Sequence, residues 1–110
     1  MKINIKHLSV NRAWMWRRFK TKEYKNYEQE LMWLLKPIEL PMWKIKLVVT
    51  FWMSNKLSDI DNGLKPLIDI LQKHYKFNDR DIYELHVKKE IVKKGEEFID
   101  FDILPYAEIC

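Results

Sequence analysis

The chain has 110 residues, is 47% hydrophobic and 14% aromatic, and contains only 2 Gly and 4 Pro. This composition excludes disordered, collagen-like and low-complexity chains, and the length suits a single compact domain spanning residues 1–110. One cysteine excludes an internal disulfide, and no apolar run approaches the ~18 residues typical of a membrane span. We therefore expect a cytoplasmic protein without a membrane partner.

The formal net charge of +4 is unevenly distributed along the chain. Residues 1–25 contain eight Lys and Arg against the single acid Glu23, a formal charge of +7, which leaves −3 for the remainder. Aromatic residues lie among these bases. Bases neutralise phosphates and flat rings stack on nucleobases, so the pattern is compatible with nucleic-acid binding. Charge alone is equally compatible with a solvated basic surface that has no particular partner.

Hydrophobic periodicity predicts two helices and four strands. Thr21 is the expected cap of the first helix and Pro37 its end, and the last two strands are expected to pair as a hairpin around Gly95. The sequence therefore predicts a small α/β (α+β) domain with helices packed on one mixed sheet. In β-α-β-α-β-β order, the expected elements are residues 2–8, 22–36, 43–53, 62–74, 82–92 and 97–104.

Pro66 conflicts with the second predicted helix, because proline removes a backbone donor and kinks a helix interior. If Asp61 caps that helix, Pro66 lies inside it. The conflict predicts either a later helix start or an irregular first turn.

The segment from Ser58 to Lys65 carries the most chemistry. Asp59 and Asp61 are two residues apart, and in extended backbone both side chains point to the same side. Converging carboxylates favour a cation between them, and Mg²⁺ prefers such hard oxygen ligands. Lys65 follows on the predicted helix, where its ammonium can stabilise charge on a phosphate. Two acids and a lysine are the residue set of a metal-dependent nuclease, whereas a helix cap and an exposed acid are the plainer interpretation.

A third acid would complete a metal site. Asp79 and Asp81 follow the second predicted helix and return toward the sheet, although Asn78 and Asp79 are also ordinary turn formers. Asp69 lies four residues after Lys65 and is expected to pair with it.

Asp100 and Asp102 repeat the spacing of the first acid pair. Apolar residues alternate with them, so the in-and-out pattern of a strand explains both. We expect these two acids to be structural.

Two motifs occur in order along the chain: Asp59-x-Asp61-Asn62-x-x-Lys65-Pro66-x-x-Asp69-x-Leu71 and Asn78-Asp79-Arg80-x-Ile82. Together with the basic N-terminal stretch they resemble the RusA family of Holliday junction resolvases over nearly the whole chain. There are three departures: Asn78 replaces a frequent acid, Asp81 stands where an amide residue is usual, and Gly63 replaces a bulky apolar residue. Asp81 is therefore an alternative to Asp79, or an addition to it, as the third acid.

The resemblance implies a homodimeric endonuclease that binds branched DNA, namely four-way junctions, in recombination and repair. It implies dependence on Mg²⁺ or Mn²⁺ without a small-molecule cofactor, paired symmetric nicks, and a bacterial or phage origin. By correspondence, Asp59, Asp61 and Asp79 are the metal-binding acids and Lys65 the catalytic lysine. The expected DNA contacts are Arg12, Arg17, Arg18, Lys20, Lys56, Lys88 and Lys89.

Two other classes remain as alternatives. A non-catalytic basic protein that recognises branched DNA would use the acids as caps and turns. A protein-interaction domain would use the five tryptophans only as core.

Overall fold

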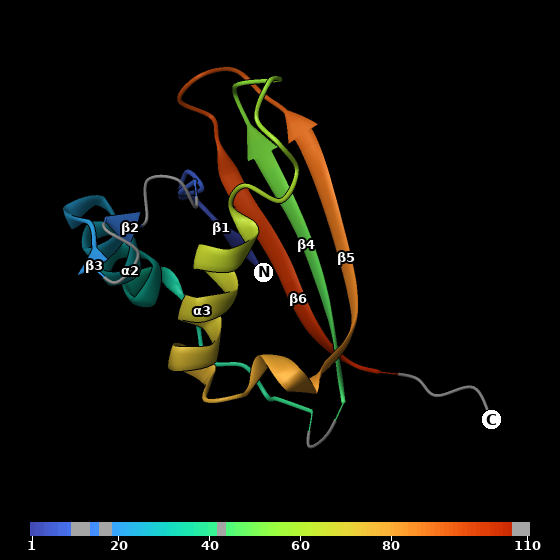
Figure 1. Ribbon diagram of the computed structural model, residues 1–110. Helices are drawn as coiled ribbons and strands as arrows, with labels where there is room; N and C mark the ends of the chain where they lie inside the picture. The colour runs from blue at the N-terminus through green and yellow to red at the C-terminus, as the bar shows by residue number, and fades with distance from the viewer. Residues whose placement is uncertain (10–13, 16–18, 42–43, 107–110) are drawn as a thin grey trace.

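The computed structural model describes residues 1–9, 14–15, 19–41 and 44–106. Two helices lie on one side of a four-stranded mixed sheet whose strand order is β1-β6-β4-β5, so the small α+β fold agrees with the prediction (Figure 1). The helices are α2 (Lys22–Leu34) and α3 (Leu64–Tyr75), with the short 3-10 turn η1 (Asp79–Asp81) after α3. The strands of the sheet are β1 (Lys2–Ile3), β4 (Ile45–Met53), β5 (Ile82–Ile91) and β6 (Phe98–Pro105).

Strand β4 forms the centre of the sheet. It pairs antiparallel with β6 on one side and parallel with β5 on the other. Its alternating apolar residues all face the helices and are at most 2% exposed. Every second residue of β4 is apolar, and these residues are buried because β4 lies between β6 and β5 and under both helices. The row therefore forms the centre of the hydrophobic core. The row consists of Ile45, Leu47, Val49, Phe51 and Met53.

The predicted hairpin between the last two strands is wrong. β5 and β6 do not pair; they flank β4 on opposite sides. The reason is that α3 connects β4 to β5, and a helical crossover brings the chain back parallel to its starting strand. The chain then passes the end of β4, where the Val92 N–H donates to the Met53 carbonyl at 2.8 Å, before β6 begins.

Helix α2 forms where the sequence predicts it. Thr21 Oγ1 accepts a hydrogen bond from the Tyr24 N–H at 3.1 Å, which caps the helix. Tyr24, Tyr27 and Leu31 are buried on one face, and the helix ends at Leu34, before Pro37.

Within the described part of the chain, no helix is long and apolar enough to cross a membrane.

Helix α3 starts later than predicted, which resolves the conflict at Pro66. Its N-cap is Gly63 and not Asp61, so Pro66 is the third helical residue. An N–H at that position has no intrahelical partner, so proline costs no hydrogen bond there. A Cβ on Gly63 would lie 2.9 Å from the Cβ of His7 and 3.2 Å from a ring carbon of Phe51. The glycine therefore lets this turn approach the core closely.

The N-terminal region differs in part from the predicted strand and loop. The strand stops at Ile3, because the chain turns and the Ile5 N–H donates to the Ile3 carbonyl at 2.8 Å. Ile5 and Leu8 nevertheless remain buried. The sequence predicts a loop over residues 9–20, but this segment contains a small antiparallel pair, β2 (Trp14–Met15) with β3 (Phe19–Lys20).

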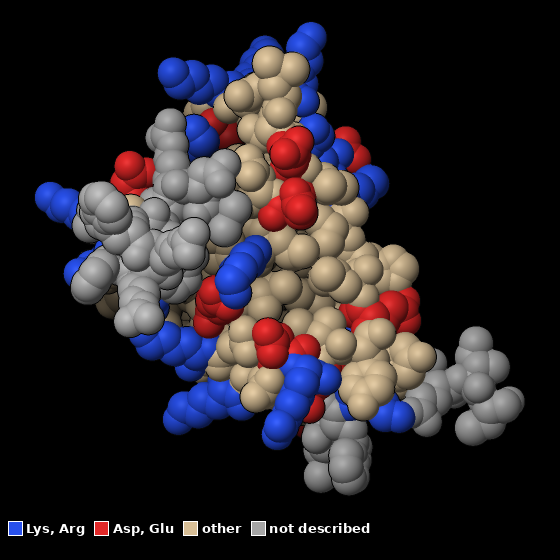
Figure 2. All heavy atoms as spheres, viewed as in Figure 1, with Lys and Arg blue, Asp and Glu red and all other residues tan. Residues whose placement is uncertain are grey.

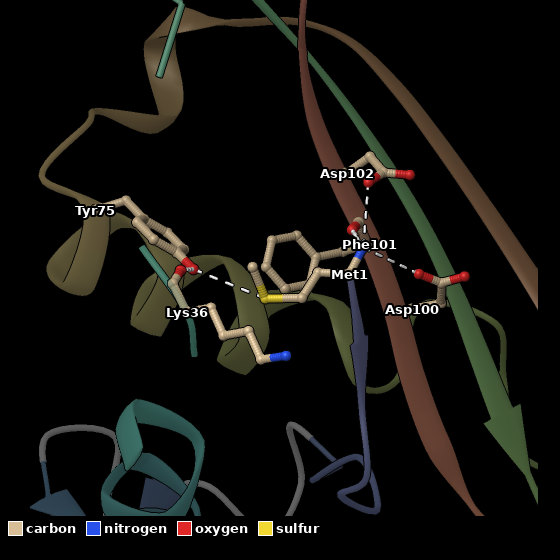
Figure 3. A network of polar contacts seen from close by, with 6 residues as sticks. All are labelled: Met1, Lys36, Tyr75, Asp100, Phe101 and Asp102. Atoms are coloured by element: carbon tan, nitrogen blue, oxygen red, sulfur yellow. Dashed lines mark hydrogen bonds and ion pairs between the residues drawn. The ribbon is translucent and has the colours of Figure 1, made fainter. Parts of the chain in front are cut away.

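Asp100 and Asp102 have the structural role that their alternation predicts. The Met1 amino nitrogen lies 3.3 Å from Asp100 Oδ1 and 3.1 Å from Asp102 Oδ1 (Figure 3). Nearby, the Tyr75 hydroxyl at the end of α3 donates to the Lys36 carbonyl, as Figure 3 also shows. These contacts join β1, β6, α3 and the segment after α2 at one corner of the fold.

Candidate active site

A pocket of about 470 Å³ lies between α3, η1 and the beginning of β5. Figure 2 shows acidic side chains on the face that carries α3 and its flanking segments. Part of the wall is apolar, formed by Leu64, Ile68, Ile82 and Leu85. The charged residues that line the pocket are Asp61, Lys65, Asp69, Asp79 and Glu84.

The loop between β4 and α3 places the first two predicted acids differently from an extended strand. The Asn62 N–H donates to the Asp59 carbonyl and the Leu64 N–H to the Asp61 carbonyl, both at 3.1 Å. These are successive turns, so the prediction that both carboxylates point to one side of extended backbone is wrong. Both residues are exposed, but Asp61 lines the pocket and Asp59 does not.

Lys89 anchors this loop from β5. Its Nζ donates to the Lys56 carbonyl at 3.1 Å and to the Ser58 carbonyl at 2.7 Å. Ser58 immediately precedes Asp59 in the chain, and Lys56 lies three residues before it. The side chain predicted as a DNA contact therefore fixes the position of the acidic loop.

Lys65 and Asp69 form the predicted pair on α3. Lys65 Nζ lies 3.5 Å from Asp69 Oδ2, and the lysine side chain is 64% exposed. An exposed pair of this kind adds little to stability. It does bias the ammonium toward the pocket that both residues line.

The turn after α3 places Asp79 at the same pocket. The Asp79 N–H donates to Gln72 Oε1 at 2.8 Å, which ties η1 to α3. Asn78 Oδ1 accepts from the Arg80 N–H at 3.0 Å, so the residue that departs from the family pattern caps η1. Asp79 lines the pocket and Asp81, two residues later, does not.

The donor set fits Mg²⁺ by its chemistry. Asp61 and Asp79 bring carboxylate oxygens to one pocket, and Mg²⁺ is commonly held by one or two carboxylates with water completing its octahedron. Over residues 1–9, 14–15, 19–41 and 44–106, no three His, Cys, Asp or Glu side chains are grouped so that they could hold a metal ion. The arrangement therefore fits a largely hydrated ion better than an ion enclosed by protein ligands.

Sequence reasoning did not assign Glu84 to the pocket. Its carboxylate hydrogen bonds to His86 and lies 3.4 Å from Lys46 Nζ. The bond from His86, followed by the charge of Lys46, lowers the pKa of Glu84. Strand alternation predicts a solvated face for this residue, and only the packing of α3 and η1 beside β5 reveals that it borders the pocket. His86 is exposed.

The other predicted DNA contacts are dispersed. Lys20 Nζ lies 3.7 Å from Glu28 Oε2, and Lys88 Nζ lies 3.2 Å from Glu90 Oε1. Lys56 is exposed on the acidic loop. Three further predicted contacts lie outside the described residues: Arg12, Arg17 and Arg18.

His7 lines a second pocket, of about 300 Å³, which borders the same loop at Ser58 and Asn62. Its Nδ1 is buried and has no hydrogen-bond partner among the described residues. Burial, and next the charge of Lys6, lower the pKa of His7. The His7 side chain packs against the turn at Gly63, two residues after Asp61.

The fold and the pocket together define a small α+β domain that presents acids and a lysine at one surface depression. The family model described as Endodeoxyribonuclease RusA matches residues 6–99. Because this match covers most of the chain, the protein belongs to the RusA family of endodeoxyribonucleases, as the resemblance predicts. No curated protein sequence matches the chain significantly.

Proposed function

We propose that this protein is a Holliday junction resolvase, a metal-dependent endonuclease that makes paired symmetric nicks in four-way DNA junctions. The observation that carries the proposal is the pocket in which Asp61 and Lys65 meet Asp79 from a separate segment. Family membership supports DNA as the substrate.

Asp61 and Asp79 would hold Mg²⁺ or Mn²⁺, with Asp59 contributing from the same loop. A bound ion would polarise the scissile phosphate and lower the pKa of an attacking water. The carboxylates would orient that water, and the four acids and one lysine that line the pocket give it a negative formal charge that favours a cation.

Lys65 would stabilise the negative charge that develops on the phosphate oxygens. Its pairing with Asp69 at 3.5 Å holds the ammonium near the pocket before DNA arrives. Such preorganised charge stabilises a transition state more than a mobile group does, because little reorganisation is needed during the reaction. The products would carry 5′-phosphate and 3′-hydroxyl ends, which a ligase can seal.

Symmetric cutting of two strands requires two sites related by a twofold axis, so a homodimer is part of the proposal. A cytoplasmic activity in a bacterial or phage-infected cell, where such junctions form, is also part of the proposal.

The test is cleavage of a labelled synthetic four-way junction with Mg²⁺, with Mn²⁺ and with EDTA. Asp79→Asn and Asp81→Asn form a matched pair, because both residues belong to η1 and only Asp79 lines the pocket. We expect ligatable paired nicks from the wild type with metal, a loss of about 10²-fold or more in Asp61→Asn and Asp79→Asn, and little change in Asp81→Asn.

Two results would contradict the proposal. Undiminished cleavage by Asp61→Asn would remove that residue from the mechanism. Tight junction binding without cleavage at any Mg²⁺ or Mn²⁺ concentration would identify a non-catalytic protein that recognises branched DNA.

A further inference from the structure

Strand β5 is a long edge strand. Its ten residues, Ile82–Ile91, pair with β4 along one side, and no strand of the described chain pairs with the other side. Figure 1 shows β5 at the border of the sheet, at the opposite edge from β1. An uncovered edge of this length presents a row of backbone donors and acceptors that can template another strand.

The helix side of β5 is also incompletely covered. Leu85 is 43% exposed and Ile91 48%, whereas the corresponding row of β4 is at most 2% exposed. In the register of the sheet, Leu85 lies beside Leu47 and Ile91 beside Met53. An apolar row that continues the core and then meets solvent is typical of a surface covered by a partner.

We propose that a second copy of this chain adds its β5 to this edge in antiparallel orientation, with the twofold axis at His86. With the axis there, Glu84 of each copy lies opposite Lys88 of the partner subunit. Opposite charges directly across an antiparallel pair are stabilising, and symmetry makes this pairing occur twice. On the other face, the same register places Leu85 opposite Val87 of the partner subunit.

Neighbouring registers are less complementary. Residues directly opposite in an antiparallel pair have side chains on the same face of the sheet. The twofold axis must therefore pass through a residue and not between two residues, so the neighbouring registers have the axis at Leu85 or at Val87. An axis at Val87 would place Glu84 opposite the partner's Glu90, which brings like charges together twice. An axis at Leu85 would place Glu84 opposite the partner's His86 and Lys88 opposite the partner's Ile82, so this register lacks the pairing of Glu84 with a lysine.

The inference deepens the proposed function, because it specifies the homodimer on which paired cutting rests. Tyr83, Glu84 and Leu85 line the candidate active site and also belong to the shared strand. Pairing at His86 would join the two sheets into one and place both pockets beside the twofold axis.

Disulfide cross-linking tests the register in the full chain. In a Cys110→Ser background, we expect His86→Cys to cross-link to itself under mild oxidation, because directly opposite Cα atoms are about 4.5–5.5 Å apart. Glu90→Cys, on the same face of β5, is the matched control. It should not cross-link, since two copies of position 90 would lie on the order of 25 Å apart. Glu84→Cys and Lys88→Cys proteins should cross-link to each other only when mixed.

Charge exchange tests the interface without cysteines. We expect Glu84→Lys or Lys88→Glu to weaken the dimer roughly tenfold or more in sedimentation, because each places two like-charged pairs at the interface. The double variant, Glu84→Lys with Lys88→Glu, should restore wild-type association. If the single variants dissociated only because they failed to fold, the double variant would not recover the dimer, so recovery identifies a charge pairing across the interface.

The outcomes separate this inference from the proposed function. A dimer that does not cross-link at His86→Cys and ignores the charge exchange would overturn the β5 interface, while junction cleavage by that dimer would leave the resolvase proposal intact. A chain that stays monomeric at all concentrations, with or without DNA, would overturn the interface as well. Loss of junction cleavage in a protein that does cross-link would count only against the resolvase.

Discussion

At the scale of single residues, the site depends on side chains that hold the acidic loop as well as on the acids. Lys89 donates to two carbonyls of that loop, at 3.1 and 2.7 Å. Both bonds are charge-assisted and one is partly buried, so they restrict the loop more than an exposed ion pair would. Lys89 is therefore a positioning residue for Asp59 and Asp61.

We expect Lys89→Met to lower junction cleavage by about 10- to 100-fold, because small misplacements of a catalytic group are costly. The fall should be mainly in kcat, and hydrogen exchange should quicken at residues 55–58. Lys93→Met removes a lysine from the turn after β5 and is the control. Equal effects of the two variants on cleavage and exchange would mean that Lys89 acts only through overall charge.

His7 makes stability depend on pH. Burial lowers the pKa of His7 below its ordinary value of 6.5, so the folded state resists the proton that the unfolded chain accepts. Stability from this residue is complete above pH 6.5 and is lost as the pH falls from there through the folded pKa. Urea midpoints between pH 7.5 and 5 should fall more steeply for the wild type than for His7→Gln. Parallel curves would contradict the assignment.

At the scale of elements, the sequence predicts a helix boundary correctly where the capping residue is adjacent in the chain. Thr21 caps α2, and apolar spacing buries Tyr24, Tyr27 and Leu31. The start of α3 is different, because the turn that precedes it packs against His7 and Phe51 across the fold. That long-range contact moves the cap from Asp61 to Gly63.

Removing the cap of α2 should be measurable. Thr21→Ala leaves the Tyr24 N–H without its acceptor and should lower the free energy of unfolding by about 1 kcal/mol. Thr21→Ser keeps an oxygen in the same place and should retain most of that stability. The comparison is made by urea unfolding at pH 7.5, and a serine variant as unstable as the alanine variant would show that the methyl group, not the cap, matters.

At the scale of the whole molecule, charge separates the N-terminal quarter from the rest. Residues 1–25 carry a formal charge of +7 within a chain of net charge +4, while the pocket is lined by four acids and Lys65. A basic segment attached to an acidic site would bind DNA through phosphates and leave the acids for a cation.

Junction binding should therefore weaken steeply with salt, and specific bases should set the slope. Each phosphate contact contributes a slope of about 0.9 in a plot of log K against log salt on duplex DNA. We expect Arg17→Gln with Arg18→Gln to reduce the slope by about twice that amount. Lys93→Gln with Lys94→Gln makes the same charge change in the turn after β5 and should leave the slope nearly unchanged. Binding is measured by fluorescence anisotropy in EDTA, so cleavage does not interfere.

The sequence by itself determined the features that depend on neighbours in the chain. The helical stripe of α2, the alternation of β4, the Lys65–Asp69 pair and the motif from Asp59 to Ile82 could all be predicted, because their spacing is fixed by local backbone geometry. The motif also predicts the RusA family, and family membership requires only the order of those residues.

Only the tertiary structure decided which segments meet. Whether β6 pairs with β5 or with β4 depends on where α3 returns the chain, and alternation is the same in both cases. The pocket that joins Asp61 to Asp79 and the contact of Lys89 with the acidic loop likewise connect residues distant in sequence. Such contacts are selected by the burial of the whole core, and no local pattern records them.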